Sequence, residues 1–359
     1  MLPMRGRARK NSWISAGENS CIEGLKSLKF QPVDHRLPRV TVVVAARPGQ
    51  AEVQALNAAR SLDYPAELLE IIVARGRQPS VQRNAALRAA RGEWIYFLDD
   101  DSVPLPGNLK RAAVYFPDPK VKMIGGPNVC PPDAPPLEKI FAAVLSSWLA
   151  FGPSRARYAA LGSTRDSGEK ELILCNLAAR RDALTELGGF NESLYPNEEN
   201  ALMDDLKKRG GRLIYDPEFS VHRRPRRTLK AFFKMLMTYG RGRAEQFRVN
   251  PTPASAPNFV PPLFCLYLLF LLIFVAIPGG AALTPWKWWS AAPLAAYACA
   301  VILQTLLLIP ANGLFKGLAA GPLLAAGNIL YGIGFWRGLF TKLRPSEKGP
   351  QKEVTLEKF

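Results

Sequence analysis

Apolar positions between residues 39 and 98 recur with two periods, one typical of buried strands and one of amphipathic helices. Three short runs are rich in β-branched and large apolar residues, and two stretches between them have helical spacing. The predicted strands cover Arg39–Ala46, Leu68–Ala74 and Trp94–Leu98, and the predicted helices cover residues 50–62 and Val81–Ala90, the second capped by Ser80. This alternation predicts an α/β fold with a parallel sheet, whose ligands bind beyond the carboxyl ends of the strands.

Two further apolar segments follow the third predicted strand. Val121–Gly126 predicts another strand, and Leu137–Phe151 predicts an apolar helix of about four turns. That helix is too short to cross a bilayer, which needs about 20 residues. It is interpreted either as an interfacial helix or as part of the core, and the sequence leaves both open.

Three long uncharged runs occupy the region after residue 249. They are Phe259–Ile277, Trp288–Ile309 and Leu318–Trp336, and each is long enough to cross a bilayer. Tryptophans at 286, 288 and 289 are typical of the membrane interface. The alternative is a set of buried helices in a soluble protein. We therefore expect a poorly ordered basic leader (1–38), an α/β domain (39–250), a membrane domain with two or three transmembrane helices (258–340) and a polar tail (341–359).

Positive charge is concentrated just before the first apolar run. The formal net charge is +17, and Lys207–Arg248 holds 13 Lys and Arg against three acidic residues. Such a cluster attracts anionic headgroups and predicts a multi-pass protein of the inner (plasma) membrane with a cytoplasmic polar domain. The tail is also basic, but three full crossings would place it on the opposite side, so the number of crossings stays open. The patch lacks interleaved aromatic residues, and no nucleic-acid partner is expected.

The five cysteines do not suggest a cross-linked or zinc-binding protein. Their number is odd, their spacing is irregular and no C-x-x-C occurs. We therefore expect reduced thiols and neither a disulfide framework nor a zinc site.

A run of three carboxylates, Asp99-Asp100-Asp101, comes directly after the third predicted strand. Asp99 and Asp101 are two positions apart on an extended segment, so their side chains can point the same way. Two such carboxylates at a sheet edge suit Mg²⁺ or Mn²⁺, which would bridge a diphosphate. The alternative is a solvated turn that caps a helix, since Ser102 and Pro104 follow.

Two other groups of residues carry candidate chemistry. Glu198 and Glu199 stand at a predicted helix start, where a carboxylate either favours the helix dipole or acts as a general base. His222 lies among arginines, which keeps its imidazole uncharged and free to bind a metal. The arginines beside it would hold phosphate, and they are Arg223, Arg224, Arg226 and Arg227.

The order of these motifs resembles the inverting nucleotide-sugar glycosyltransferases of family 2. The motifs are the βαβ unit, LDDDS, CNLAARR from Cys175, GGFNES from Gly188, NEEN from Asn197, YDPE from Tyr215 and the histidine. The resemblance covers roughly residues 38–250 and implies a GT-A fold, Rossmann-like with a mixed, mostly parallel sheet. Together with the membrane tail, it is similar to the membrane-bound exopolysaccharide glycosyltransferases of the succinoglycan type.

The resemblance also implies roles for individual residues. Asp101 and His222 would hold Mg²⁺ or Mn²⁺, and Glu199, beside Glu198, would be the catalytic base, although Asp is usual there. The expected nucleotide-sugar-binding residues are Ala46, Arg47, Arg75, Arg83, Asp99, Asp100 and Asn176. The expected acceptor or phosphate-binding residues are Arg223, Arg224, Arg226 and Arg227.

Two departures from the family pattern change the expected activity. No carboxylate follows the second strand in Ala74–Ser80, so backbone groups at residues 45–47 are expected to hold the base. The Q-x-x-R-W motif of processive synthases is absent from the sequence, which favours transfer of a single sugar. We expect a nucleotide-diphosphate sugar donor, with UDP-sugar preferred, and a polyprenyl-linked acceptor in cell-surface polysaccharide synthesis. The alternatives are a polyprenyl-phosphate sugar synthase and a non-catalytic membrane scaffold.

Overall fold

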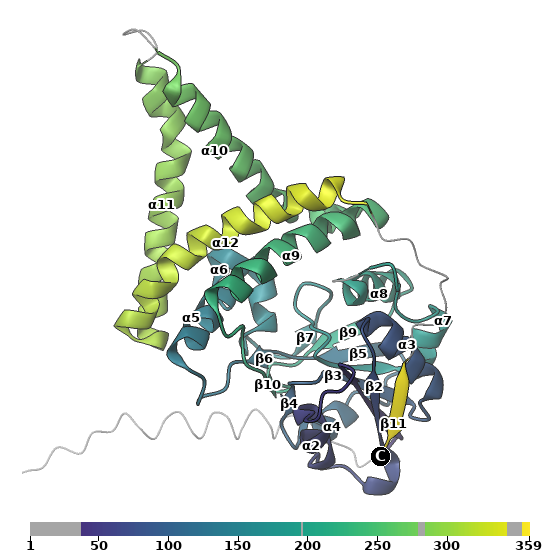
Figure 1. The fold of residues 1–359 in the computed structure, drawn as a ribbon. Helices are drawn as coiled ribbons and strands as arrows, with labels where there is room; N and C mark the ends of the chain where they lie inside the picture. Colours follow the sequence, from purple (N-terminus) through teal and green to yellow (C-terminus); the bar gives the residue numbers. More distant parts are fainter. Residues whose placement is uncertain (1–36, 195–196, 279–283, 343–353) are drawn as a thin grey trace, which may run out of the picture. The chain divides into compact units, whose positions relative to one another are not determined.

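A computed structural model describes residues 37–194, 197–278, 284–342 and 354–359 (Figure 1). Almost all of the predicted leader, with Cys21 and His35, lies outside these residues. The main sheet has eight strands in the order β11-β2-β1-β3-β8-β5-β9-β7. The strands β2, β1, β3, β5 and β9 run in one direction, and β8, β7 and β11 run in the other. The sheet is therefore mixed, with most strands parallel to one another, as expected.

The first three strands confirm the predicted βαβαβ unit. They are β1 (Val40–Ala46), β2 (Leu69–Arg75) and β3 (Trp94–Asp99), and β1 pairs in parallel with both others. The connections contain α2 (Gln54–Arg60), η1 (Ala66–Leu68) and α3 (Pro79–Ala89). Ser80 was expected to cap α3 but does not. Its hydroxyl donates to the carbonyl of Leu194 instead.

The second half of the domain extends the main sheet and confirms the strand predicted at Val121–Gly126. The main sheet gains β5 (Val121–Gly125), β7 (Arg165–Asp166), β8 (Asn176–Arg180) and β9 (Arg212–Tyr215). A small sheet contains β4 (Val103–Pro104), β6 (Asn128–Val129) and β10 (Val221–His222) in the order β4-β10-β6. The helices of this half are α4 (Asn108–Ala113), α7 (Arg181–Glu186) and α8 (Glu198–Lys208).

The predicted helix Leu137–Phe151 is divided in two. It consists of α5 (Pro136–Leu145) and α6 (Trp148–Phe151), followed by the 3-10 helix η2 (Gly152–Arg157). Ser147 lies at the break, and its hydroxyl donates to the carbonyl of Val144 at 2.7 Å. Such side-chain to backbone bonds compete with helix continuation. Phe141 of α5 stacks on Phe232 of α9 (Leu229–Val249), with ring centroids 4.2 Å apart, so much of this segment is core.

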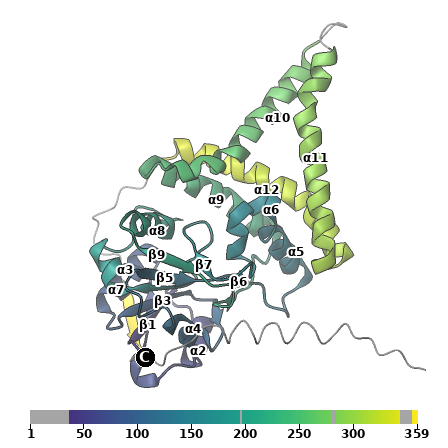
Figure 2. The same cartoon turned by 180° about the vertical axis from the view of Figure 1, so that it is seen from behind.

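The three uncharged runs form long helices, as predicted. The 3-10 helix η3 (Pro253–Phe259) leads into α10 (Val260–Ala276), which is followed by α11 (Thr284–Asn312) and α12 (Leu314–Phe340). All three are long and apolar enough to cross a membrane, but more of α12 is buried than of α10 or α11. In both views α10 and α11 form a hairpin, while α12 runs beside α9 (Figure 2).

Glycines allow α12 to lie against α9. A Cβ atom at Gly334 would collide with the backbone of Met237, and one at Gly240 would collide with the backbone of Tyr331. Small residues at such positions let two helix backbones approach closely. Gly334 of α12 and Gly240 of α9 are therefore part of a helix–helix contact.

The strand β11 (Thr355–Lys358) returns the chain to the α/β domain after the long apolar helices. It pairs antiparallel with β2 at the edge of the main sheet, with Thr355 opposite Arg75. The predicted polar tail thus contributes a strand to the sheet.

Candidate active site

Three consecutive residues of α3 connect the carboxyl ends of the strands to the rest of the site. The amide of Gln82 donates to the carbonyls of Ala46 and Ala74, at 2.8 and 2.6 Å, and so holds the ends of β1 and β2 together. Arg83 reaches the acidic side chains of the site. Asn84 bonds both the amide and the carbonyl of Phe190. Arg83 and Asn84 therefore organise two different parts of the site.

Arg83 forms a buried bridge between β3 and α8. Its Nη2 lies 2.8 Å from Oδ1 of Asp99, and its Nη1 lies 2.9 Å from Oε1 of Glu198. Burial raises the pKa of Asp99, but Arg223 and Arg83 outweigh burial and hold this pKa below its usual value. The guanidinium thus joins the first residue of the acidic run to the helix that carries the candidate base.

Asp99 and Asp101 converge on one guanidinium, although Asp100 and Asp101 lie in a turn after β3 and not on the extended segment that was expected. Arg223 Nη1 lies 3.1 Å from Oδ2 of Asp99, and Arg223 Nε lies 2.5 Å from Oδ1 of Asp101. Asp100, between them, lines the cleft described below. All three carboxylates therefore belong to the same edge of the sheet.

Glu198 and Glu199 open α8, directly after a strained residue. Asn197 has a φ of 91°, the left-handed region that non-glycine residues rarely occupy. Its side-chain oxygen accepts a bond from Asn200 at 2.7 Å, which supports the turn. Burial, and then the charge of Glu199, raises the pKa of Glu198 to about 7 against the effect of Arg83. Such strain at a site of paired carboxylates is typical of functional positions.

A single cleft connects these residues with the apolar helices α10, α11 and α12. It encloses about 2130 Å³, more than the roughly 300–1,000 Å³ of a single small-molecule pocket. The predicted site residues that line it are Ala46, Arg47, Arg75, Arg83, Asp99, Asp100, Glu198, Glu199, Arg223 and Arg226. At its other end it is lined by Phe264 of α10, Tyr297 of α11, and Asn328 and Tyr331 of α12.

Some predicted site residues have other surroundings. Asn176 is fully buried, where its side chain accepts from the hydroxyl of Tyr96 at 2.8 Å and donates to the carbonyl of Phe219 at 2.6 Å. Arg224 pairs with the buried Glu138 of α5 through two bonds of 2.7 and 2.8 Å. Both therefore support the fold at this point, and neither they nor Arg227 are among the residues that line the cleft.

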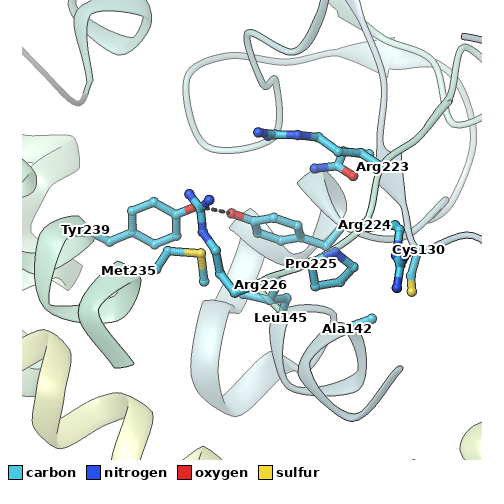
Figure 3. A pocket seen from close by; sticks show the side chains of 11 residues that line it. Cys130, Ala142, Leu145, Arg223, Arg224, Pro225, Arg226, Met235 and Tyr239 are labelled. Atoms are coloured by element: carbon cyan, nitrogen blue, oxygen red, sulfur yellow. Dashed lines mark hydrogen bonds between the residues drawn. The ribbon is translucent and has the colours of Figure 1, made fainter. Parts of the chain in front are cut away.

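A second pocket lies between α5, α9 and the segment after β10. Figure 3 shows Arg223 and Arg226 at this pocket, with Met235, Tyr239 and Leu145 around it. The hydroxyls of Tyr158 and Tyr239 are 3.2 Å apart across it. Arg223 and Arg226 also line the large cleft, so these two cations are shared between the two hollows.

Sequence reasoning missed a buried charge cluster that joins α8 to α9. Arg243 of α9 lies 2.6 Å from Glu169, and Arg157 donates to the carbonyl of Glu169 and to the side chain of Asn200. Arg157, Glu169 and Arg243 all line the cleft. The partners in this cluster are 12 to 74 positions apart in the sequence. No local pattern therefore indicates that these residues contact one another.

The residues expected to hold a cation, Asp101 and His222, lie near each other beside β4, and neither is among the residues that line the cleft. Among the described residues, no three His, Cys, Asp or Glu side chains gather into a metal cluster. Mg²⁺ is usually held by one or two carboxylates together with substrate phosphates. Asp101 precedes β4 by two residues, and His222 pairs with Val103 of β4 and has a buried Nδ1 without a hydrogen-bond partner in the described structure. These two donors fit the protein's share of such a site.

Comparison with known proteins gives consistent results. A family model described as "Glycosyltransferase like family 2" matches residues 25–238. The chain is 27% identical over 190 residues to a pre-mycofactocin glycosyltransferase of Mycobacterium tuberculosis, across 50% of this chain and 37% of that protein. It is 27% identical over 210 residues to the succinoglycan biosynthesis protein ExoA of Rhizobium meliloti, across 56% of each. The matches thus span about half or less of the length of these relatives.

A solved structure supports the fold. The mannosyltransferase PcManGT of Pyrobaculum calidifontis, in complex with GDP-Man and Mn²⁺, has a TM-score of 0.51 at 20% identity. The match covers 89% of this chain and 93% of that chain. At this identity the likeness shows the fold alone, and it confirms the expected GT-A domain with apolar helices after it.

Proposed function

Because the chain belongs to glycosyltransferase family 2, we propose that it transfers one sugar from a nucleotide-diphosphate sugar to a lipid-linked acceptor, with inversion. One observation carries this proposal. The cleft that holds the acidic residues at the strand ends continues without a break to the apolar helices α10, α11 and α12. A donor that dissolves in water and an acceptor anchored in a membrane can therefore meet in it.

Glu199 is the proposed general base. It opens α8, lines the cleft, and has no ion pair or hydrogen bond among the described residues. Its carboxylate takes the proton of the acceptor hydroxyl while that oxygen forms a bond to the anomeric carbon of the donor. The bond from the anomeric carbon to the diphosphate oxygen breaks, and the nucleoside diphosphate leaves with the electron pair. Attack opposite the leaving group inverts the anomeric centre.

Glu198 and the cations have supporting roles. The Arg83 bridge holds Glu198, and with it the first turn of α8, at a defined position relative to Asp99. Arg223 and Arg226 lie where negative charge on the diphosphate would develop. A divalent cation bound by Asp101 and His222 would neutralise part of that charge.

The membrane end of the cleft is the proposed entrance for the acceptor. Its polar groups include Asn328, which donates to the hydroxyl of Tyr297 at 3.0 Å between α12 and α11. Lys234 of α9 and Arg226 also line the cleft and add positive charge to it. Apolar walls with a few cations suit a polyprenyl chain whose phosphate remains near the membrane surface. Synthesis of a cell-surface polysaccharide is the proposed setting.

We propose that α10 and α11 cross the inner (plasma) membrane and that α12 lies with α9 near its cytoplasmic face. Apolar side chains of α10 and α11 are widely exposed, among them Leu272 and Trp288. The pairing of β11 with β2 supports this arrangement, because both ends of the helical region then lie on the side of the catalytic domain. Two crossings satisfy this condition and three do not. The basic residues of α9 and of the segment before it favour the cytoplasmic side.

Release of the nucleotide from donor sugars tests the proposal. Membranes containing the protein are supplied with UDP-, GDP- and dTDP-sugars, with and without Mn²⁺, and with polyprenyl-linked acceptors. We expect Asp101→Asn to abolish release, and Glu199→Gln to lower it by about 10²–10⁴-fold, the usual size of a general-base contribution. The exposed Glu186→Gln is the matched control.

The same assay separates the proposal from the two alternatives. A polyprenyl-phosphate sugar synthase has an acceptor that needs no base, so near-normal turnover of Glu199→Gln with polyprenyl phosphate would favour it. A non-catalytic scaffold would release no nucleotide from any donor. Full activity of Asp101→Asn would rule out the proposed cation site.

A further inference from the structure

We propose that the segment 354–358 forms one wall of the site for the nucleoside half of the donor. This inference rests on the proposed function and adds a binding surface to it. The segment is separated from β2 by more than 270 positions, yet β11 continues the main sheet beside β2. Without β11, β2 would be the edge strand and would expose unpaired backbone groups next to the cleft.

The order of the strands places the nucleoside toward β11. The acidic residues that face the diphosphate follow β3, and β1, β2 and β11 lie successively farther along the sheet. Neighbouring strands are about 4.8 Å apart, so the carboxyl end of β2 is about 10 Å from that of β3, and β11 is about 14 Å away. A nucleoside attached to a diphosphate at β3 therefore extends across β1 toward β2 and β11. Thr355 is at this end of β11, and it lines the cleft together with Ala46 and Arg47.

The register shows which side chains share a face. Residues directly opposite each other in an antiparallel pair lie on the same face, as do alternate residues of one strand. Arg75, Thr355 and Glu357 therefore lie on one face of the sheet. The opposite face carries Leu356, which packs on the main core. Leu356 anchors the strand, while Thr355 leaves an exposed hydroxyl at the cleft.

Glu357 holds Arg75 in place beside Thr355. Its carboxylate lies 2.6 Å from Nε of Arg75, whose Nη1 also donates to the carbonyl of Gln50 at 2.7 Å. The loop after β2, residues 75–80, contains no carboxylate. A carboxylate at this corner of the cleft is thus supplied by β11. Thr355 is the proposed contact to the base, and Glu357 is the positioning residue that orients Arg75.

Equilibrium binding of UDP, GDP and dTDP to the purified full chain, with Mn²⁺ present, tests this inference. The variants are Thr355→Val, which removes only the hydroxyl, and Glu357→Gln, which removes the charge. We expect each to raise the Kd of the preferred nucleotide about three- to tenfold, the effect of one lost hydrogen bond, and to change the ranking of the three nucleotides. Lys358→Gln is the control, since Lys358 donates to the carbonyl of Ala89 on the face away from Thr355 and should leave binding within about twofold.

Each outcome has a distinct meaning. Unchanged affinities in both variants, with normal binding by the wild type, would overturn the inference and leave the proposed function intact. An equal rise in the Kd of all three nucleotides would also overturn the inference, because β11 would then only stabilise the sheet and would not contact the base. If the wild type binds none of the nucleotides, the proposed function itself fails. Deletion of residues 354–359 should abolish selectivity, and the point variants keep the test valid if that deletion fails to fold.

Discussion

The guanidinium of Arg83 donates to the carboxylate of Glu198 over 2.9 Å, in a position where both side chains are almost completely buried. The same guanidinium donates to Asp99 over 2.8 Å. One side chain thus sets the distance between the end of β3 and the start of α8. The proposed donor site and the proposed base depend on this distance.

Arg83→Lys should separate the charge of Arg83 from its geometry. Lysine keeps the positive charge but lacks the planar fork that reaches two carboxylates at once. We expect turnover to fall about 10²-fold, since small displacements of catalytic groups have effects of this size. Arg88→Lys is the control, because Arg88 is exposed on the same helix. Equal turnover of the two variants in the nucleotide-release assay would contradict the role of the bridge.

Glu198 should give the protein a distinctive dependence of stability on pH. Its pKa is about 7 in the folded protein, raised by burial and by Glu199, against a usual value of 4.5. Between these two pH values the folded protein binds more protons than the unfolded chain, so the free energy of unfolding falls as the pH rises. Glu198→Gln cannot ionise, and its melting temperature relative to wild type should therefore increase from pH 5 to pH 8. A difference that does not change with pH would show that Glu198 titrates alike in both states.

Alanine at Gly188 and alanine at Gly189 can be compared to separate the cost of backbone strain from the cost of a steric clash. Both have positive φ, at 82° and 77°, but a Cβ atom at Gly189 would lie 2.5 Å from the side-chain oxygen of Asn84, whereas one at Gly188 would meet open space. Gly188→Ala should cost about 1–2 kcal/mol through backbone strain alone. Gly189→Ala should cost more and should also lower turnover, because Asn84 follows Arg83 on α3. Equal melting temperatures for the two variants would contradict this account.

Cysteine labelling can test the proposed membrane arrangement. In a variant without native cysteines, single cysteines replace Trp286 at the start of α11, the exposed Arg227 and Lys358 of β11. We expect an impermeant maleimide to reach Trp286→Cys from one side of sealed vesicles and the other two from the opposite side. Labelling of Lys358→Cys from the same side as Trp286→Cys would require an odd number of crossings between β10 and β11.

The parts of the fold that were predicted from sequence depend on local patterns. The first three strands were predicted from short apolar runs, and the structure confirms them as Val40–Ala46, Leu69–Arg75 and Trp94–Asp99. A strand that is buried on both faces needs apolar residues throughout, which makes it visible in the sequence. The convergence of Asp99 and Asp101 was expected from the alternation of an extended segment, but it arises from a turn, because β3 ends at Asp99 and Asp101 lies beyond it. Family and fold were predicted from the order of several motifs, and the comparisons confirm both.

The parts that could not be predicted depend on contacts between distant residues. The bond between Arg75 and Glu357 spans 282 positions, and neither residue has an unusual neighbourhood in the sequence. Asn176 belongs to a matching motif, yet its burial is set by Tyr96 and Phe219, which come from other strands and loops. The glycines of α12 weaken its apolar run, and only the position of α9 shows what they allow.

The place of β11 in the sheet has a consequence for the order in which the protein matures. Residues 355–358 are synthesised after α10, α11 and α12, whereas the strands they join come from residues 40–215. Until they leave the ribosome, β2 keeps an open edge, and a contact over so long a loop forms late because closing the loop costs entropy. A nascent chain whose helices have not yet been made therefore has an incomplete sheet beside the nucleotide cleft. Under the proposed function, completion of the donor site is in this way coupled to the synthesis of α10, α11 and α12, so that activity would begin only when the chain has the helices proposed to reach a lipid-linked acceptor.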